Sequence, residues 1–279
     1  MSRGITGQKV LILWVSRVII WISIILMSFP MIWIVASSFS KGDSFFYGSV
    51  FPTEWGVDNY QRLFAETDFV IWVTNSLKIC TFVAIIQIML TITAAYGFSR
   101  FRFTGRKYGL MSLLILQIFP SSMATAAIYY MIYKLNLVDN PLALIFFLAG
   151  GSAYNIWLMK NYIDKLPREL DEAALVDGAG HLTIFLKITI PLAIPMIVVI
   201  FLFSFIGAYS EFIITAVIMR SPENLTLSVG LQTFINTQFN ARWTQFSAAS
   251  IISSLPIMIV FMMLQRFLQS GLAAGAVKG

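Results

Sequence analysis

The chain has 279 residues, of which 58% are hydrophobic and 11% are charged. Soluble domains carry about 25% charged residues, so this composition excludes an ordinary soluble protein and predicts one embedded in a lipid bilayer. The net charge of +6 comes from basic residues dispersed along the chain rather than from a basic domain, which excludes a nucleic-acid partner.

Six segments are apolar over the length of about 20 residues that crosses a bilayer as a helix. The predicted spans are 10–37, 69–98, 108–133, 141–160, 190–219 and 245–268. We therefore expect an all-α, polytopic membrane protein with six transmembrane helices.

The positions of lysine and arginine predict the orientation, because cytoplasmic loops are enriched in both. With the N-terminus inside, 13 of the 19 basic residues fall in cytoplasmic segments, including a cluster at 100–107. The first outer loop, 38–68, is acidic by contrast. Both termini are thus predicted to be cytoplasmic, as is the segment between the fourth and fifth spans.

That cytoplasmic segment, 167–189, is predicted to form a helix, a sharp bend and a second helix. Pro167 and the acidic residues after it suit the first turn of a helix. Gly178 and Gly180 suit its end and the bend. A short apolar helix over about 182–188 is then expected to lead into the next span.

Motifs for catalysis, metal binding and nucleotide binding are missing from the sequence. There is no G-x-x-x-x-G-K-[S/T] segment to hold ATP phosphates, and one cysteine and one histidine offer no metal-ligand spacing. We therefore predict no catalytic residue, no metal and no cofactor in this chain. ATP-driven transport would require a motor on another subunit.

This segment, 167–189, which we call the elbow, resembles the coupling motif of ABC-importer permeases. That motif consists of Glu-Ala-Ala, a Gly six residues after the Glu, and then I-x-L-P. Ile190 replaces the usual Leu. The resemblance implies the type I ABC importer permease fold and docking of the elbow on an ATPase. Ile188 and Pro191 complete the motif. By this resemblance, the residues that couple to the ATPase are Glu172, Ala173, Ala174, Asp177, Gly178 and Ala179.

From about Asn75 to Gly279, the chain resembles the smaller permease of carbohydrate importers of the maltose/maltodextrin type. The similarity rests on Ala94–Arg100, on the segment Tyr209-Ser210-Glu211-Phe212 and on the C-terminal tail. It implies that Gly275, Val277 and Lys278 contact the ATPase. The implied cargo is maltose, maltodextrin or a related oligosaccharide, moved by alternating access across a bacterial cytoplasmic membrane.

The resemblance also implies partners. These are two ATP-binding subunits that hold ATP and Mg, a second homologous permease and an extracytoplasmic sugar-binding protein. The outer loop before the last span is expected either to be an ordinary solvated loop or to dock that protein. Its candidate docking residues are Asn236, Gln238, Asn240 and Trp243.

The predicted domains are a first segment with its span (1–37), an outer loop (38–68), a five-helix permease core (69–268, elbow 167–189) and a tail (269–279). Within the core, Glu211 has three possible roles: a hydrogen bond to a neighbouring helix or sister subunit, a place in the pathway, or proton relay. Tyr209 and Ser210 are likewise expected either to pack against a neighbouring helix or to line the pathway. Candidate sugar contacts are Tyr96, Gln117, Tyr129, Tyr130, Tyr209 and Ser210.

Three alternatives remain open from the sequence. An ABC permease for a non-sugar solute would share the elbow. An ion-coupled secondary carrier would need buried ion sites, and an intramembrane enzyme would need paired catalytic side chains. Glu211 alone supplies neither, so the sugar permease is the favoured prediction.

Overall fold

The computed structural model describes residues 7–42, 51–118, 121–236 and 241–276. These residues are mostly helical, and the β-pairing among them is an isolated bridge between Ser40 and Trp55. They form two compact units. The first comprises the chain up to Thr67 together with Leu231–Ile252, and the second comprises Asp68–Gly230 with the chain from Ser253 onward.

The first unit is held together by polar contacts around Asn59. It contains α1 (Gly7–Ser38), α2 (Asp58–Glu66) and the first turns of α13 (Trp243–Ala276). The buried Asn59 amide donates hydrogen bonds to the Ser38 and Ser40 carbonyls at 3.0 and 2.7 Å, and Thr244 Oγ1 donates to Asn59 Oδ1 at 3.2 Å. The apolar side chains of α1 from Leu11 to Ile32 are exposed, so this part of the helix is suited to contact lipid.

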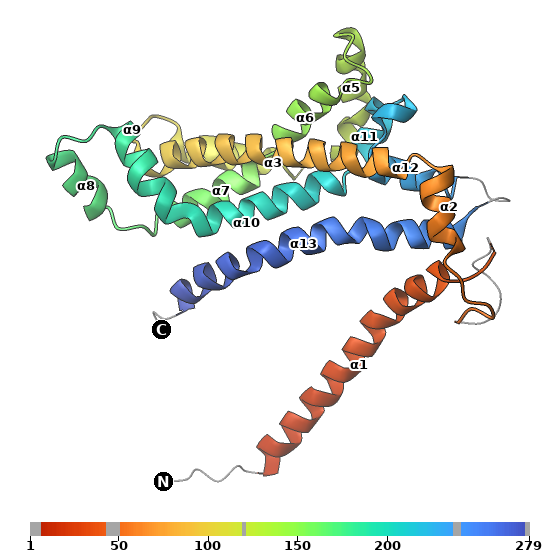
Figure 1. The fold of residues 1–279 in the computed structure, drawn as a ribbon. Coiled ribbons are helices and arrows are strands. Elements are labelled where there is room, and N and C mark those ends of the chain that lie inside the picture. The colour runs from red at the N-terminus through yellow and green to blue at the C-terminus, as the bar shows by residue number, and fades with distance from the viewer. Residues whose placement is uncertain (1–6, 43–50, 119–120, 237–240, 277–279) are drawn as a thin grey trace. The chain divides into compact units, whose positions relative to one another are not determined.

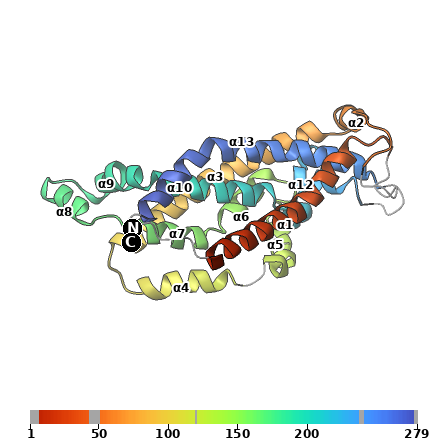
Figure 2. The same cartoon turned by 90° about the horizontal axis from the view of Figure 1, so that it is seen from below.

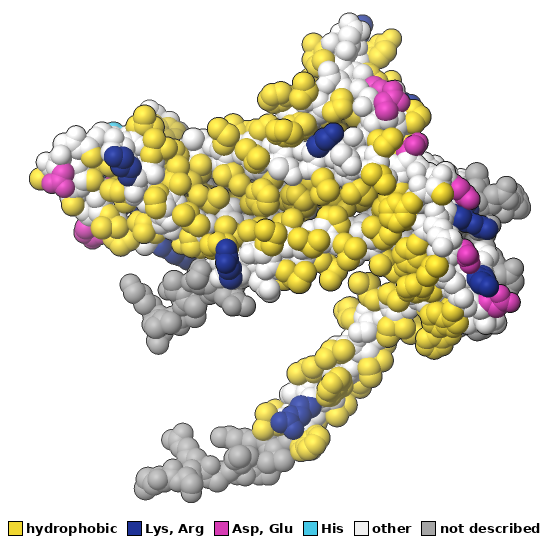
Figure 3. Space-filling view, in the orientation of Figure 1, with side chains coloured by type: hydrophobic (Ala, Val, Ile, Leu, Met, Phe, Trp, Pro, Cys, Tyr) yellow, Lys and Arg dark blue, Asp and Glu magenta, His cyan; other side chains and the backbone are white. Residues whose placement is uncertain are grey.

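The second unit is built around α3 and α10, which lie side by side, with α7 packed on α3 (Figures 1 and 2). The helices of this unit are α3 (Phe69–Arg100), α4 (Arg106–Leu116), α5 (Ser121–Lys134), α6 (Pro141–Ala149), α7 (Ala153–Ile163), α8 (Glu169–Val176), α9 (His181–Ile184), α10 (Ile190–Tyr209), α11 (Ile213–Ile218), the part of α12 (Leu227–Gln232) up to Gly230 and the part of α13 from Ser253 onward. On the face in Figure 3, hydrophobic side chains dominate the middle of the α3–α10 body.

Four helices among the described residues are long and apolar enough to cross a membrane. They are Leu11–Ser38, Phe69–Arg100, His181–Tyr209 and Trp243–Phe267. A fifth span forms if α6 and α7, bent by 46° at their junction, are counted together. The first, second and sixth predicted spans therefore correspond to long helices.

Three predicted spans differ from the structure in detail. The third, 108–133, is described as two helices, α4 and α5, with residues 119–120 outside the described ranges. The fourth is bent at Gly150–Ser152, and the fifth ends at Tyr209 rather than Met219. A six-span count remains a prediction.

The second helix of the elbow also differs from the prediction. Instead of a separate helix over 182–188, α9 continues through a π-helical turn, Phe185–Thr189, into α10. Pro191, the second residue of α10, follows the π-helical turn, and the helical stretch runs from His181 to Tyr209 without a break. The elbow is thus joined rigidly to a membrane-length helix.

Candidate functional site

The elbow, residues 167–189, lies beyond one end of α3 and α10 (Figure 1). Its first helix, α8, begins with Glu169, Asp171 and Glu172, whose carboxylates favour the positive end of the helix dipole. It ends at Val176, and Gly178, two residues further on, has φ +84°. The N–H groups of Gly178 and Ala179 donate to the Leu175 and Ala174 carbonyls at 3.0 and 2.9 Å, a Schellman motif that stops the helix sharply.

The outer surface of the elbow combines carboxylates with uncovered apolar side chains. Val176 is 88% exposed, and Glu172 and Ala173 beside it are exposed as well. The other large apolar side chains exposed on the elbow are Leu170, Leu175, Leu182 and Leu186. We call these residues, with Glu172, Ala173 and Val176, the elbow surface. An apolar patch rimmed by charge is typical of a protein-docking site.

A buried ion pair fixes α8 to the end of α3. Arg100 Nε lies 2.6 Å from Asp171 Oδ2, and the two side chains are only 7% and 15% exposed. Arg100 Nη2 also donates to the Leu166 carbonyl at 3.3 Å, just ahead of α8. One guanidinium from a membrane-length helix therefore holds the entry and the first turn of the elbow helix.

A second polar contact lies next to the first. Ser99 Oγ donates to Asp164 Oδ1 at 2.6 Å, and Lys160 Nζ lies 2.6 Å from Asp164 Oδ2. Burial alone would raise the pKa of the Asp164 carboxyl, but hydrogen bonds from Lys160 and Ser99 and the charges of Lys160 and Arg106 outweigh it and lower the pKa. The carboxylate thus stays ionised and joins the end of α7 to α3. We call Ser99, Arg100, Asp164 and Asp171 the elbow anchor.

The exit of the elbow is held by aromatic side chains. The Tyr96 ring lies 4.9 Å from the Phe185 ring and 5.6 Å from the Phe101 ring, between centroids. Phe101 packs edge-on against His181 at 5.1 Å, and Tyr96 OH donates to the His181 carbonyl at 3.4 Å. Both limbs of the elbow therefore contact the same end of α3.

The three predicted residues at the end of α10 lie in different surroundings. Tyr209 is buried and its hydroxyl donates to the Ser253 carbonyl on α13 at 2.9 Å, while Ser210 is exposed. Glu211 accepts hydrogen bonds from the N–H groups of Ile214 and Thr215 at 2.8 and 2.9 Å and from the Thr215 hydroxyl. Its carboxylate thus caps the start of α11, and it also lines a cavity of about 620 Å³.

The predicted tail and docking residues are described only in part. Gly275 lies in the last turn of α13, whereas Val277 and Lys278 lie outside the described residues. Asn236 is exposed in a bend, and Gln238 and Asn240 also lie outside the described residues. Trp243 begins α13 and packs edge-on against Phe246 at 6.2 Å.

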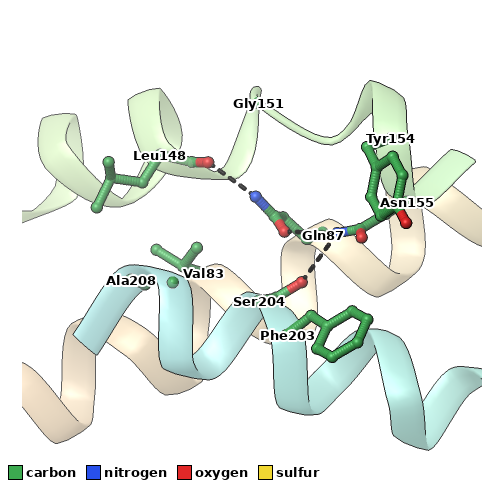
Figure 4. Close-up of a pocket in the computed structure, with 10 residues that line it drawn as sticks. Val83, Gln87, Leu148, Gly151, Tyr154, Asn155, Phe203, Ser204 and Ala208 are labelled. Atoms are coloured by element: carbon green, nitrogen blue, oxygen red, sulfur yellow. Dashed lines mark hydrogen bonds between the residues drawn. The ribbon is translucent and has the colours of Figure 1, made fainter. Parts of the chain in front are cut away.

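A cavity where α3, α7 and α10 meet was not predicted. It has a volume of about 270 Å³ and is lined by Gln87, Asn155 and Ser204 together with apolar and aromatic side chains (Figure 4). The candidate sugar contacts Tyr96, Gln117, Tyr129, Tyr130, Tyr209 and Ser210 are all described, and none is among the residues that line it. The sequence feature that could have indicated this cavity is Gln87, a polar residue inside an otherwise apolar run of the second span.

Comparisons with known proteins agree with this geometry. Residues 12–274 match the family described as binding-protein-dependent transport system inner membrane component. The maltodextrin transport system permease protein MdxG of Bacillus subtilis is 39% identical over 256 residues, which cover 91% of this chain and 92% of the relative. The maltose/maltodextrin permease MalG of Escherichia coli is 33% identical over 286 residues, 96% of each chain.

A solved structure has the same fold. A chain of a bacterial ABC transporter that imports the acidic polysaccharide alginate superposes with a TM-score of 0.80 at 24% identity, covering 95% of this chain and 99% of that chain. The chain therefore belongs to the family of binding-protein-dependent transport system inner membrane components. It is a multi-pass permease of the ABC importer class.

Proposed function

We propose that the chain forms half of the membrane pathway of an ATP-driven importer of neutral oligosaccharides, of the maltodextrin or galacto-oligosaccharide kind. The relatives MdxG and MalG are named for maltodextrin and maltose transport, and GanQ of Bacillus subtilis, 37% identical over 259 residues, is named for galactooligosaccharides. The second half of the pathway comes from a homologous permease, and an extracytoplasmic binding protein delivers the sugar.

The elbow surface carries this proposal. It is an apolar and acidic patch outside the membrane helices, and it is tied to α3 and α10 by buried contacts. Because the chain has no phosphate-binding loop of its own, a partner ATPase that binds ATP and Mg is the source of the motion. The ATPase moves the elbow between two positions, and the attached helices follow, which alternates access to the pathway.

The residues Glu172, Ala173, Ala174, Asp177, Gly178 and Ala179 are proposed to make or shape the ATPase contact. The small side chains of Ala173 and Ala174 allow a close approach, and Gly178 sets the angle of the bend. The tail residues Gly275, Val277 and Lys278 are proposed to contact the same ATPase. The loop with Asn236, Gln238, Asn240 and Trp243 is proposed to receive the binding protein.

The test is purification of the chain from its native membrane in mild detergent, with mass spectrometry of the proteins that accompany it. An ATPase and a homologous permease are expected. In proteoliposomes, the complex should take up maltotriose only when ATP and the binding protein are present. Uptake by the chain alone, driven by an ion gradient, would establish the secondary carrier instead, and ATP-driven uptake of a charged solute would establish the non-sugar permease.

A further inference from the structure

α6 and α7 are bent by 46° at Gly150–Ser152, within the predicted span 141–160. Such a break leaves backbone carbonyls without helical partners, which is costly in a bilayer unless other groups satisfy them. Gln87 Nε2, from α3, donates to the Leu148 carbonyl at 2.9 Å, at the end of α6. The same carbonyl also accepts from the Gly151 N–H at 3.4 Å, so Gln87 is a second and shorter donor that supports the backbone at the break.

Two further polar side chains at the break are not needed for that support. Asn155 Nδ2 lies 3.3 Å from Gln87 Oε1 and 3.2 Å from Ser204 Oγ, and it donates to both (Figure 4). Gln87, Asn155 and Ser204 are 7%, 9% and 6% exposed. They come from α3, α7 and α10 and meet at the cavity of about 270 Å³. Uncharged polar side chains inside membrane proteins hydrogen-bond neighbouring helices, and transporter substrate sites typically form where a membrane helix is broken, as α6–α7 is here.

We infer that this cavity is a subsite that contacts a neutral oligosaccharide during its passage, with Asn155 and Ser204 binding hydroxyls and Tyr154 covering a sugar ring. This deepens the proposed function and rests on it. Amide and hydroxyl groups both donate and accept hydrogen bonds, as sugar hydroxyls do. Tyr154 and Phe203, which also line the cavity, are each 51% exposed and offer apolar faces to a ring.

Charge in and around the cavity favours a neutral cargo. Among the described residues that line it, none is charged, so an anionic solute would find no cation to pair with. The neighbouring cavity of about 620 Å³ shares Leu148 and Gly151 with it and contains the carboxylate of Glu211, which repels anions. The volume of about 270 Å³ is just below the range of about 300–1,000 Å³ for small-molecule pockets, which suits one sugar unit of a longer chain.

The experiment uses the complete complex in proteoliposomes with saturating binding protein loaded with maltotriose. The measured quantity is maltotriose imported per ATP hydrolysed, because a general folding defect lowers both rates whereas a lost subsite lowers their ratio. Tyr154→Ala and Asn155→Leu should each lower the ratio about tenfold, equivalent to about 1.4 kcal/mol. The matched control is Thr91→Val, one turn along α3 from Gln87, fully buried and outside the cavity lining, and its ratio should equal that of the unaltered complex.

If Asn155→Leu fails to assemble, Tyr154→Ala still tests the subsite, because this half-exposed side chain can be removed without opening the core. An unchanged ratio in Tyr154→Ala, with the unaltered complex importing maltotriose, overturns the subsite and leaves the proposed function intact. Failure of the unaltered complex to import maltotriose or any other neutral oligosaccharide overturns the proposed function, and the subsite with it.

Discussion

Arg100 Nε lies 2.6 Å from the Asp171 carboxylate, and this pair joins the last residue of a membrane-length helix to the first turn of α8. An exposed pair would contribute little, since solvent screens it. Here both side chains are largely buried, so loss of one partner leaves a charge without compensation. The contact therefore suits the transfer of motion from the elbow into the membrane helices.

Asp171→Asn should loosen α8 from α3. We expect a loss of about 2 kcal/mol in the docking of α8, below the 3–5 kcal/mol typical of broken fully buried pairs, because Arg100 keeps its bond to the Leu166 carbonyl. Hydrogen–deuterium exchange of the α8 amides in detergent measures this as faster exchange. The matched control, Glu169→Gln, alters an exposed carboxylate in the same turn. Equal exchange in both variants would mean that the pair does not hold the helix.

Gly178→Ala should strain the bend of the elbow. A Cβ at Gly178 would meet no atom within 4 Å, so the effect comes from φ +84° alone, which costs a residue with a Cβ about 1–2 kcal/mol. Sugar-stimulated ATP hydrolysis by the complex should fall several-fold while membrane insertion is unaffected. Gly180→Ala is the control, because Gly180 has φ −79° and equally open surroundings. A normal hydrolysis rate in Gly178→Ala would indicate that the angle of the bend is unimportant.

Gly230→Ala should destabilise the packing of α12 on α3. A Cβ at Gly230 would overlap the Trp72 indole ring, which is itself buried. Overpacking of this kind costs about 1–3 kcal/mol and should lower the thermal unfolding midpoint in detergent. Gly97→Ala, on α3 with no atom within 4 Å of the added Cβ, should keep or raise the midpoint. Equal midpoints for the two variants would argue against the close contact with Trp72.

The carboxyl of Asp139 should give acid sensitivity to the loop between α5 and α6. Partial burial would raise its pKa, but hydrogen bonds from the N–H groups of Arg220 and Ser221 and from the Asn224 amide lower it to about 2. Because the pKa of Asp139 in the folded state is below its unfolded value of 3.8, the ionised carboxylate stabilises the folded protein at pH values above about 4. This stability is lost as the pH falls from about 4 to 2.

Asp139→Asn should therefore lower the unfolding midpoint at pH 7 and flatten its dependence on pH between about 4 and 2. The control, Glu66→Gln, removes an exposed carboxylate at the end of α2 and should leave that dependence as it is. Thermal unfolding in detergent over a series of pH values measures both. If the unfolding midpoint of Asp139→Asn still fell between about pH 4 and 2 as steeply as that of the unaltered protein, the assigned hydrogen bonds would be contradicted.

Local patterns explain which parts of the fold the sequence could predict. The helix Phe69–Arg100 and the stop at Gly178 follow from continuous hydrophobicity and from the conformational freedom of glycine, both readable along the chain. The pairing of Arg100 with Asp171 and the meeting of Gln87, Asn155 and Ser204 depend on how distant helices pack. Hydropathy also missed the bend at Gly150, because glycine is tolerated in membrane helices and does not by itself mark a break.

The most direct test of the account is sugar-stimulated ATP hydrolysis by the purified complex carrying Glu172→Lys. Glu172 lies exposed on the elbow surface, so the charge reversal should spare insertion and the fold of the chain. We expect that the chain still enters the membrane beside its partner permease and that stimulation of the ATPase by loaded binding protein is abolished. Glu169→Lys is the control for charge alone. Full stimulation in a correctly assembled Glu172→Lys complex would contradict coupling through the elbow.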